Sequence, residues 1–418
     1  MRRAPALLRA DVAVCLFLTL ALPAGQAMAQ AKPPIKFGVV AAVSGEAASY
    51  SKPFLDAIQM IAEDFNKEGG IMGRPVQVVF YDDRGIPDAA LQAAKKLVFD
   101  DKVHTLQPGS TSGAIFTAMP VGKDGKVAMW GYGLAKQWLV EGEGMIWRSA
   151  APDQVMIGAL ARFAHEQQKL RNVGILHIDT FYGETSRDIF KQEFEALGGK
   201  VVKVVTYADG SRDFSSQLLT LAKEKVDSVF LVVQGGAMAP ALRQVRQFIP
   251  RAWTVLADNN LYNPKVREES ADLANGIYYY THPMIIQNPD PLVQQWIGKL
   301  RQRLGTFHEI MARAIIGMTV MKAAIEKAGT TDAIPVMKQV HRMKNFPTPM
   351  GNFTYDPRDG EGLKSGVVLQ VKAGGDMSKD QVIQTITVTR ELYDKRIDYT
   401  KFFGPGYREE LYAFHGVK

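Results

Sequence analysis

Apolar and polar residues alternate in blocks along this chain from residue 35 onward. Segment 35–43 is an almost unbroken apolar run, which is typical of a strand buried on both faces of a parallel sheet. In segment 51–70, apolar residues from Phe54 to Phe65 recur at spacings of four, three and four, which places them on one face of a helix. A pair of glycines follows and ends that helix. The pattern therefore predicts a buried strand and then an amphipathic helix.

The same order of strand, loop and helix repeats as far as about residue 260. The expected strands are rich in branched and aromatic residues, and they lie at 74–83, 101–106, 126–133, 172–179, 200–207, 227–234 and 253–260. Helices are expected at 87–101, where Pro87 opens the helix, and at 186–199. Strands that alternate with helices predict an α/β protein whose sheet is mostly parallel and covered on both faces.

Three breaks in this pattern, at 146–154, 276–283 and 351–362, indicate two lobes with a cleft between them and a three-segment hinge. The chain after the second break predicts helices at 290–304, 309–329 and 331–343, and after the third break strands at 366–374 and 381–388. We expect the first lobe to comprise 30–151 plus 280–353, and the second 152–279 plus 354–418. Ligands of open α/β sheets bind outside the carboxyl ends of the strands. The candidate positions are therefore the strand exits at 107–113, 130–133, 179–184, 234–238 and 257–262.

The first residues differ from the rest of the chain. Three arginines precede the apolar run 12–22, and Ala27 and Ala29 follow it in an A-x-A arrangement. This pattern predicts a secretory signal peptide, residues 1–29, cleaved after Ala29, and hence a periplasmic protein. The alternatives are an N-terminal membrane anchor, which so short a run disfavours, and lipidation at Cys15.

Composition excludes several classes of function. Cys15 is the single cysteine, so the mature chain has no disulfide and no thiol chemistry. The net charge is +7, and loss of three Arg and one Asp with residues 1–29 leaves 47 basic against 42 acidic residues, or +5. The basic residues are scattered without aromatic residues between them, so we expect no nucleic-acid partner. The histidines have no metal-ligand spacing, so we expect no metal and no cofactor.

The segment "QPGSTSG", residues 107–113, is the strongest candidate for chemistry because it joins a strand to a helix. It lacks the lysine of a phosphate-binding loop, and Thr111 stands where a nucleophile elbow has serine. A serine-type hydrolase is therefore a minor alternative, and we expect no enzyme. Small hydroxyl residues with free N–H groups at a helix N-terminus suit an anion such as a carboxylate. The plainer interpretation is that Ser112 is the helix N-cap. Asp82 and Asp83 are interpreted as a helix-cap and solvent-facing pair.

The chain from 35 to 83 resembles the opening of the leucine/isoleucine/valine-type periplasmic binding proteins of ABC transporters. The shared pattern is a strand ending in Ser-Gly, a tyrosine, a long helix closing in Gly-Gly-Ile, and a strand ending in Asp-Asp. The stretches "GSTSG", "DTFYGE", "DFSSQLLTLAKEKVDSVFL" and "ALRQVRQF" continue the resemblance, which covers roughly 35–370. It implies two Rossmann-like lobes with parallel central sheets, a three-segment hinge and a ligand enclosed between the lobes.

The resemblance also implies roles for single residues. Tyr50 and Tyr182 correspond to aromatic residues that line the cleft from the two lobes, although either could simply be a buried aromatic residue. Thr111 and Ser112, beside Ser110, correspond to the hydroxyl loop that holds a ligand carboxylate. Tyr132, between Trp130 and Gly133, falls where the family offers a backbone carbonyl to a ligand ammonium.

Three positions depart from the amino-acid binders of this family. Leu134 replaces a threonine that donates to the carboxylate, and Gln234 replaces a tyrosine. Asn259 aligns with the acid that neutralises the ammonium, and a shift of one residue would place Asp258 there instead. A buried ammonium without a carboxylate partner is unfavourable by several kcal/mol. The carboxylate site is thus kept and the ammonium site is in doubt, and the nearby apolar residues suit an apolar or aromatic acid.

These observations predict a monomeric periplasmic substrate-binding protein. It would capture a small carboxylate-bearing ligand and deliver it to an ABC transporter permease in the inner membrane. A branched-chain amino acid is favoured by the resemblance, and an aromatic acid, another non-amino acid or an amide by the departures. A ligand-sensing protein that acts on a regulator or receptor is the alternative from a different class.

Overall fold

The computed structural model describes residues 32–392 and 396–417. The predicted signal peptide and its cleavage site lie outside these residues. Pro33–Lys418 form one compact unit. No helix in the described part of the chain combines the length and the apolar character that a bilayer crossing requires.

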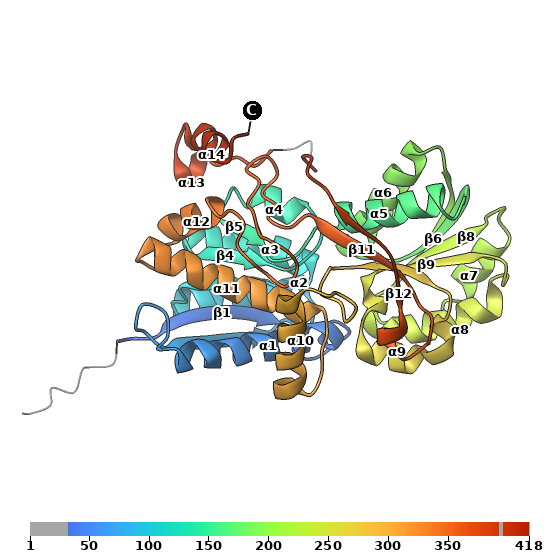
Figure 1. The fold of residues 1–418 in the computed structure, drawn as a ribbon, viewed down its shortest axis with the longest axis horizontal. Coiled ribbons are helices and arrows are strands. Elements are labelled where there is room, and N and C mark those ends of the chain that lie inside the picture. The colour runs from blue at the N-terminus through green and yellow to red at the C-terminus, as the bar shows by residue number, and fades with distance from the viewer. Residues whose placement is uncertain (1–31, 393–395, 418) are drawn as a thin grey trace, which may run out of the picture. The chain divides into compact units, whose positions relative to one another are not determined.

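The first sheet is built from the N-terminal part of this unit (Figure 1). Its five strands lie in the order β2-β1-β3-β4-β5, and all neighbouring pairs are parallel. Their bounds are β1 Ile35–Ala41, β2 Val76–Asp82, β3 Thr105–Gln107, β4 Ala128–Gly131 and β5 Ile146–Arg148. Every residue of β3, β4 and β5 is buried, including the polar Thr105 and Gln107 of β3 and the charged Arg148 of β5.

The second sheet has seven strands in the order β12-β11-β10-β9-β8-β6-β7. Their bounds are β6 Asn172–Ile178, β7 Lys200–Tyr207, β8 Ser228–Val232, β9 Thr254–Ala257, β10 Tyr278–Thr281, β11 Ser365–Gln370 and β12 Gln381–Thr387. The pairs from β7 to β10 are parallel, whereas β11 and β12 are antiparallel additions. The expectation of parallel central sheets is confirmed, and the two antiparallel strands lie at one edge of the second sheet. The chain returns to β11 on the side where β10 left the sheet, so β11 must run the opposite way.

Helices cover both faces of each sheet (Figure 1). In the first sheet α1 packs with α11 and α12 on one face, and α2 with α3 on the other; in the second, α5 pairs with α6, and α7 with α8. The apolar face from Phe54 to Phe65 that the sequence predicted is buried in α1. The helix bounds are α1 Ala48–Lys67, α2 Pro87–Lys95, η1 Lys96–Asp100, α3 Ser112–Asp124, α4 Gln137–Glu141, α5 Asp153–Glu166, α6 Phe181–Ala196, α7 Ser215–Ala222, η2 Gly235–Ala237, α8 Met238–Phe248, η3 Asn259–Leu261, α9 Pro264–Ser270, η4 Ala271–Ala274, α10 Pro291–Leu304, α11 Ile310–Ala328, α12 Ala333–His341, η5 Met377–Lys379, α13 Thr400–Phe403 and α14 Tyr407–His415.

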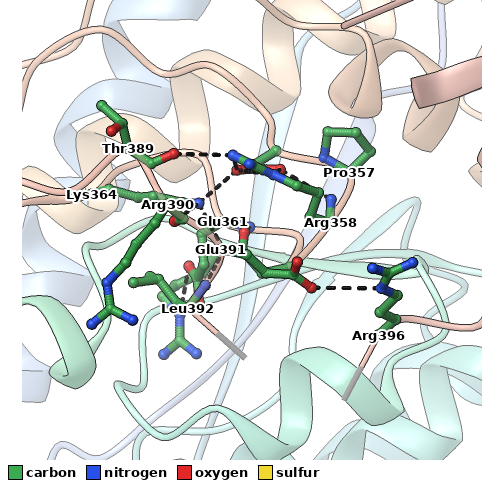
Figure 2. A network of polar contacts seen from close by, with 12 residues as sticks. Pro357, Arg358, Glu361, Lys364, Thr389, Arg390, Glu391, Leu392 and Arg396 are labelled. Carbon is green, nitrogen blue, oxygen red and sulfur yellow. Dashed lines mark hydrogen bonds and ion pairs between the residues drawn. The ribbon is translucent and has the colours of Figure 1, made fainter. Parts of the chain in front are cut away.

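Passages between the two sheets follow β5 and β10 and precede β11. The passage before β11 is held by the polar network of Figure 2. Arg358 Nη2 donates to the carbonyl of Thr389 at 3.1 Å, and Lys364 Nζ donates to the carbonyl of Arg390 at 3.2 Å. These bonds join the passage to the segment that follows β12. The lobe boundaries given above stay a prediction, apart from the C-terminal segment.

The C-terminal segment packs where the sequence did not place it. His341 of α12 lies with its ring nitrogens 3.2 Å from Tyr407 Oη and 2.9 Å from the carbonyl of Gly144. Tyr399 and Phe403 also place their rings against His341. The assignment of all of 354–418 to the second lobe is therefore wrong for α13 and α14. Tyr407 of α14 is buried beside His341 of α12, and the partly buried Phe403 of α13 packs on the same ring.

Candidate functional site

A cavity of about 360 Å³ lies where the carboxyl ends of both sheets' strands meet. All five strand exits that the sequence marked as candidates contribute residues to its wall. Ten of the twelve residues proposed from the sequence line it: Tyr50, Ser110, Thr111, Ser112, Tyr132, Gly133, Leu134, Tyr182, Gln234 and Asn259. The topology that sends parallel strands to one edge explains why these distant segments converge.

The hydroxyl loop after β3 opens helix α3 toward this cavity. Thr111, not Ser112, is the N-cap, since its Oγ1 accepts from the N–H of Ala114 at 3.1 Å. Ser112 Oγ instead accepts from the N–H groups of Leu134 at 3.2 Å and Ala135 at 3.3 Å. Ser112 thus joins two loops of the wall. Its own hydroxyl hydrogen and the N–H groups of Ser112 and Gly113, which precede the first backbone hydrogen bond of α3, are donors available to a ligand.

Asp83 fixes this loop from behind. Its carboxylate accepts from the N–H of Ser110 at 2.8 Å, from Ser110 Oγ at 2.6 Å and from the N–H of Gly85 at 2.9 Å. Burial raises the pKa of Asp83 although these bonds lower it. The solvent-facing interpretation is therefore wrong for Asp83 but fits Asp82, which is half-buried and accepts from Ser44 Oγ. Because Ser110 is committed to Asp83, it supports the loop and leaves ligand contact to its neighbours.

Aromatic residues from both sheets form the sides of the cavity. Tyr50, in the first turn of α1, accepts a hydrogen bond at its Oη from Gln234 Nε2 at 3.0 Å. Tyr182, in the first turn of α6, donates to Asp258 Oδ2 at 3.2 Å. Phe181 beside it stacks on Phe116 with ring centroids 5.5 Å apart. The Tyr50–Gln234 bond joins a residue beside the first sheet to one beside the second, so closure of the wall depends on both.

Two residues proposed from the sequence do not line the cavity. Trp130 is fully buried in the core, with its ring 5.6 Å from that of Phe54. Successive residues of a strand point to opposite faces, and Trp130 of β4 points toward α1 and α11, where it lies against Phe54 and Gly317. Asp258 is also fully buried, accepting from Tyr182 and from Asn260, and burial raises its pKa to about 7. The neighbouring Asn259 faces the cavity in its place.

The sequence analysis missed a buried ion pair at the start of α11. Arg313 Nη2 donates to Glu309 Oε1 at 2.6 Å, and Arg313 Nη1 donates to the backbone carbonyl of Tyr132 at 3.1 Å. Glu309 Oε2 lies 3.0 Å from His282 Nδ1. Burial alone would raise the pKa of Glu309, but Arg313 and His282 hold it well below its usual range. A glutamate and an arginine four residues apart in an otherwise apolar helix were the signal that could have revealed this pair.

The remaining lining residues fall into two groups. The apolar group enlarges the hydrophobic surface of the cavity wall. It consists of Ala47, Gly85, Ile86, Pro87, Gly113, Phe181 and Ile310. The polar group consists of Glu46, Arg84, Thr180, Asp209, Asn260 and His308. Glu46 forms an ion pair with Arg212 at 2.5 Å. Among the described residues, no cluster of three or more His, Cys, Asp or Glu side chains is arranged to hold a metal ion.

A family model described as "Periplasmic binding protein" matches residues 34–376. The chain belongs to the periplasmic binding protein family. Its members that resemble this chain are binding proteins and not enzymes. The resemblance to leucine/isoleucine/valine-type proteins is confirmed by a Leu/Ile/Val-binding protein of Rhizobium johnstonii, which is 27% identical over 81% of this chain and 92% of its own.

Solved structures match the fold at lower identity. A leucine-binding protein from Thermotoga maritima superposes with a TM-score of 0.76 at 22% identity, covering 84% of this chain and 99% of that one. A solute-binding protein of an ABC transporter from Rhodopseudomonas palustris, solved with 3,4-dihydroxybenzoic acid, gives 0.75 at 20% identity, covering 88% and 99%. The α/β fold with two sheets dominated by parallel strands is that of the type I periplasmic binding proteins.

Proposed function

We propose that this chain is a periplasmic substrate-binding protein that captures a small carboxylate-bearing ligand and delivers it to an ABC transporter permease in the inner membrane. The observation that carries the proposal is the α3 N-terminus at the cavity wall, where Ser112 and the first N–H groups of the helix present donors to an anion. The predicted signal peptide supports the periplasmic location. We further propose that the protein acts as a monomer and that its lobes close around the ligand.

The two solved relatives bring different ligand chemistries to the same fold. One is named for leucine and the other was solved with a benzoic acid, and their TM-scores are nearly equal. The carboxylate is what the two ligands share. The proposal therefore rests on the carboxylate site, and the choice between a branched-chain amino acid and an aromatic or other acid falls to the remaining wall.

A thermal-shift assay with acids and their primary amides tests this proposal. We expect 4-hydroxybenzoate and 4-methylpentanoate to raise the melting temperature and their amides to leave it unchanged, since a ligand at about 100 times its Kd stabilises by about 2.7 kcal/mol. Ser112→Ala should weaken acid binding at least tenfold. Ser110→Ala is the matched control, because the Ser110 donors already go to Asp83. Equal shifts by acids and amides would contradict the carboxylate site.

Delivery to a permease is tested in cells. Deletion of the gene should abolish uptake of the acid that the purified protein binds. Unchanged uptake, together with tight binding, would favour a sensing protein over a transport protein.

A further inference from the structure

The position expected to receive a ligand ammonium is already filled by a side chain of the protein. The resemblance places that ammonium at the backbone carbonyl of Tyr132. In the structure this carbonyl accepts from Arg313 Nη1 at 3.1 Å, and Arg313 is buried at the cavity wall. A fixed guanidinium thus stands where an α-amino acid would bring its own positive charge.

The acids near the cavity are in no position to rescue an ammonium. Glu309 is bound to Arg313 at one oxygen and lies against His282 with the other. Asp258 lies behind Tyr182 and does not reach the wall. Glu46 is paired with Arg212, and Asp209 is exposed to solvent, where its attraction for an ammonium is weak. A protonated amine would therefore lose its hydration and meet a cation.

Arg313 has donors to spare for an acceptor. Its guanidinium carries five N–H groups, and its Nε is buried without a hydrogen-bond partner among the described residues. Glu309 neutralises the charge of Arg313 without using all of these donors. An arginine at this position suits an oxygen of the ligand, or an apolar carbon that leaves the pair undisturbed.

We propose that Arg313 determines specificity by occupying the ammonium position, so that the cavity accepts carboxylic acids without a protonated amine. This inference rests on the proposed function, because it takes the carboxylate site at α3 as the other anchor of the ligand. The substrate class is then amine-free acids with an apolar or aromatic body, which matches the wall formed by Tyr50, Leu134 and Phe181.

Matched ligands that differ only at the α-carbon test the proposal by titration calorimetry on the purified protein. The sets are leucine, 4-methylpentanoate and 4-methyl-2-oxopentanoate, and phenylalanine, 3-phenylpropanoate and phenylpyruvate. We expect at least one amine-free acid to bind at least tenfold more tightly than its amino acid. Amino acids that bind as tightly as their amine-free counterparts would overturn the proposal.

Variants of Arg313 and Glu309 test whether this ion pair causes the preference for amine-free acids over amino acids. Arg313→Met frees the Tyr132 carbonyl and Glu309, so the preference for amine-free acids should fall at least tenfold or invert. Glu309→Gln keeps the cation and should preserve or enlarge the preference. The double variant R313M/E309Q removes both charges, so it avoids an unpaired buried glutamate if R313M alone fails to fold. It should lose the preference without gaining one for amines. A preference unchanged in both R313M and the double variant contradicts the role of Arg313.

Failure of the carboxylate site would give a different result. If amides bind and acids do not, the proposed function is wrong in its ligand class. The role of Arg313 is then decided by the same comparison between leucinamide and 4-methylpentanamide, which differ only in the amine.

Discussion

At the scale of single residues, buried carboxylates near the cavity respond to their surroundings in opposite ways. The pKa of Glu309 is lowered because Arg313 and His282 outweigh burial. Burial dominates at Asp153, whose pKa is raised to about 7 although Arg148 and Arg313 oppose the shift. One oxygen of Asp153 has no hydrogen-bond partner among the described residues. Between about pH 4 and pH 7 the native state therefore holds a proton on Asp153 that the unfolded chain releases.

This proton makes stability depend on pH with a definite sign. The pKa of Asp153 rises from about 4 in the unfolded chain to about 7 in the folded one, so the native state binds the extra proton between these values. Its contribution to stability falls as pH rises through that window. Asp153→Asn lacks this loss, so its melting temperature relative to the parent should increase from pH 4 to pH 7 and then level off. Asp100→Asn, at an exposed position, is the control. A difference independent of pH would show that Asp153 is ionised throughout.

At the scale of elements, close packing of α11 against β4 shapes the core of the first sheet and also positions two residues of the cavity wall. Gly317 of α11 lies so near Trp130 that an added Cβ would meet the indole ring at 2.0 Å. The absence of a side chain at Gly317 lets α11 approach the sheet. That approach carries Glu309 and Arg313, at the start of the same helix, to the Tyr132 carbonyl.

Two glycine-to-alanine substitutions distinguish the effect of packing on stability from the effect of helix propensity. Gly317→Ala should destabilise the protein by about 1–3 kcal/mol through overpacking and should also weaken ligand binding. Gly298→Ala in α10, where nothing lies within 4 Å of the added Cβ, should stabilise it by about 1 kcal/mol. Denaturant unfolding measures both changes. A stabilising G317A would show that α11 has room to move away from β4.

At the scale of the whole molecule, a buried ion pair connects two passages between the sheets, the one after β5 and the one before β11. Arg148, at the end of β5, binds both oxygens of Glu361 with its Nε at 3.1 Å, and neither side chain is exposed. Arg148 Nη2 also donates to the carbonyl of Ala135 at 2.8 Å, and Nη1 to that of Gly133 on the cavity wall. The guanidinium of Arg148 thus holds the two passages together and also bonds to the cavity wall.

Removal of the acid from this pair should affect stability and binding together. Glu361→Gln leaves the Arg148 charge uncompensated in the interior and should cost about 3–5 kcal/mol of unfolding free energy. Glu166→Gln, which breaks the exposed pair with Arg162, should cost no more than about 0.5 kcal/mol. Chemical denaturation and acid titration of both variants check this. A Glu361→Gln protein as stable as Glu166→Gln would contradict the role assigned to the buried pair.

The sequence by itself determined the elements and the edge of the sheets where the site lies. Hydrophobic periodicity is a local property, and α1 was readable from the apolar face that begins at Phe54. The convergence of strand exits follows from parallel topology, so the sequence sufficed to assign the loop at 107–113 to the cavity. The family pattern added the roles expected of Tyr50 and Tyr182.

Only the tertiary structure decided which side chains face the ligand. Asp258 and Asn259 are adjacent, yet packing buried the first and left the second at the wall. Trp130 and Tyr132 both pack on Phe54, and only Tyr132, just beyond the end of β4, lines the cavity. Arg313 lies 181 residues beyond Tyr132, and no local pattern predicts such a contact. The approach of α11 to the sheet made it, and with it the inference about which acids this protein binds.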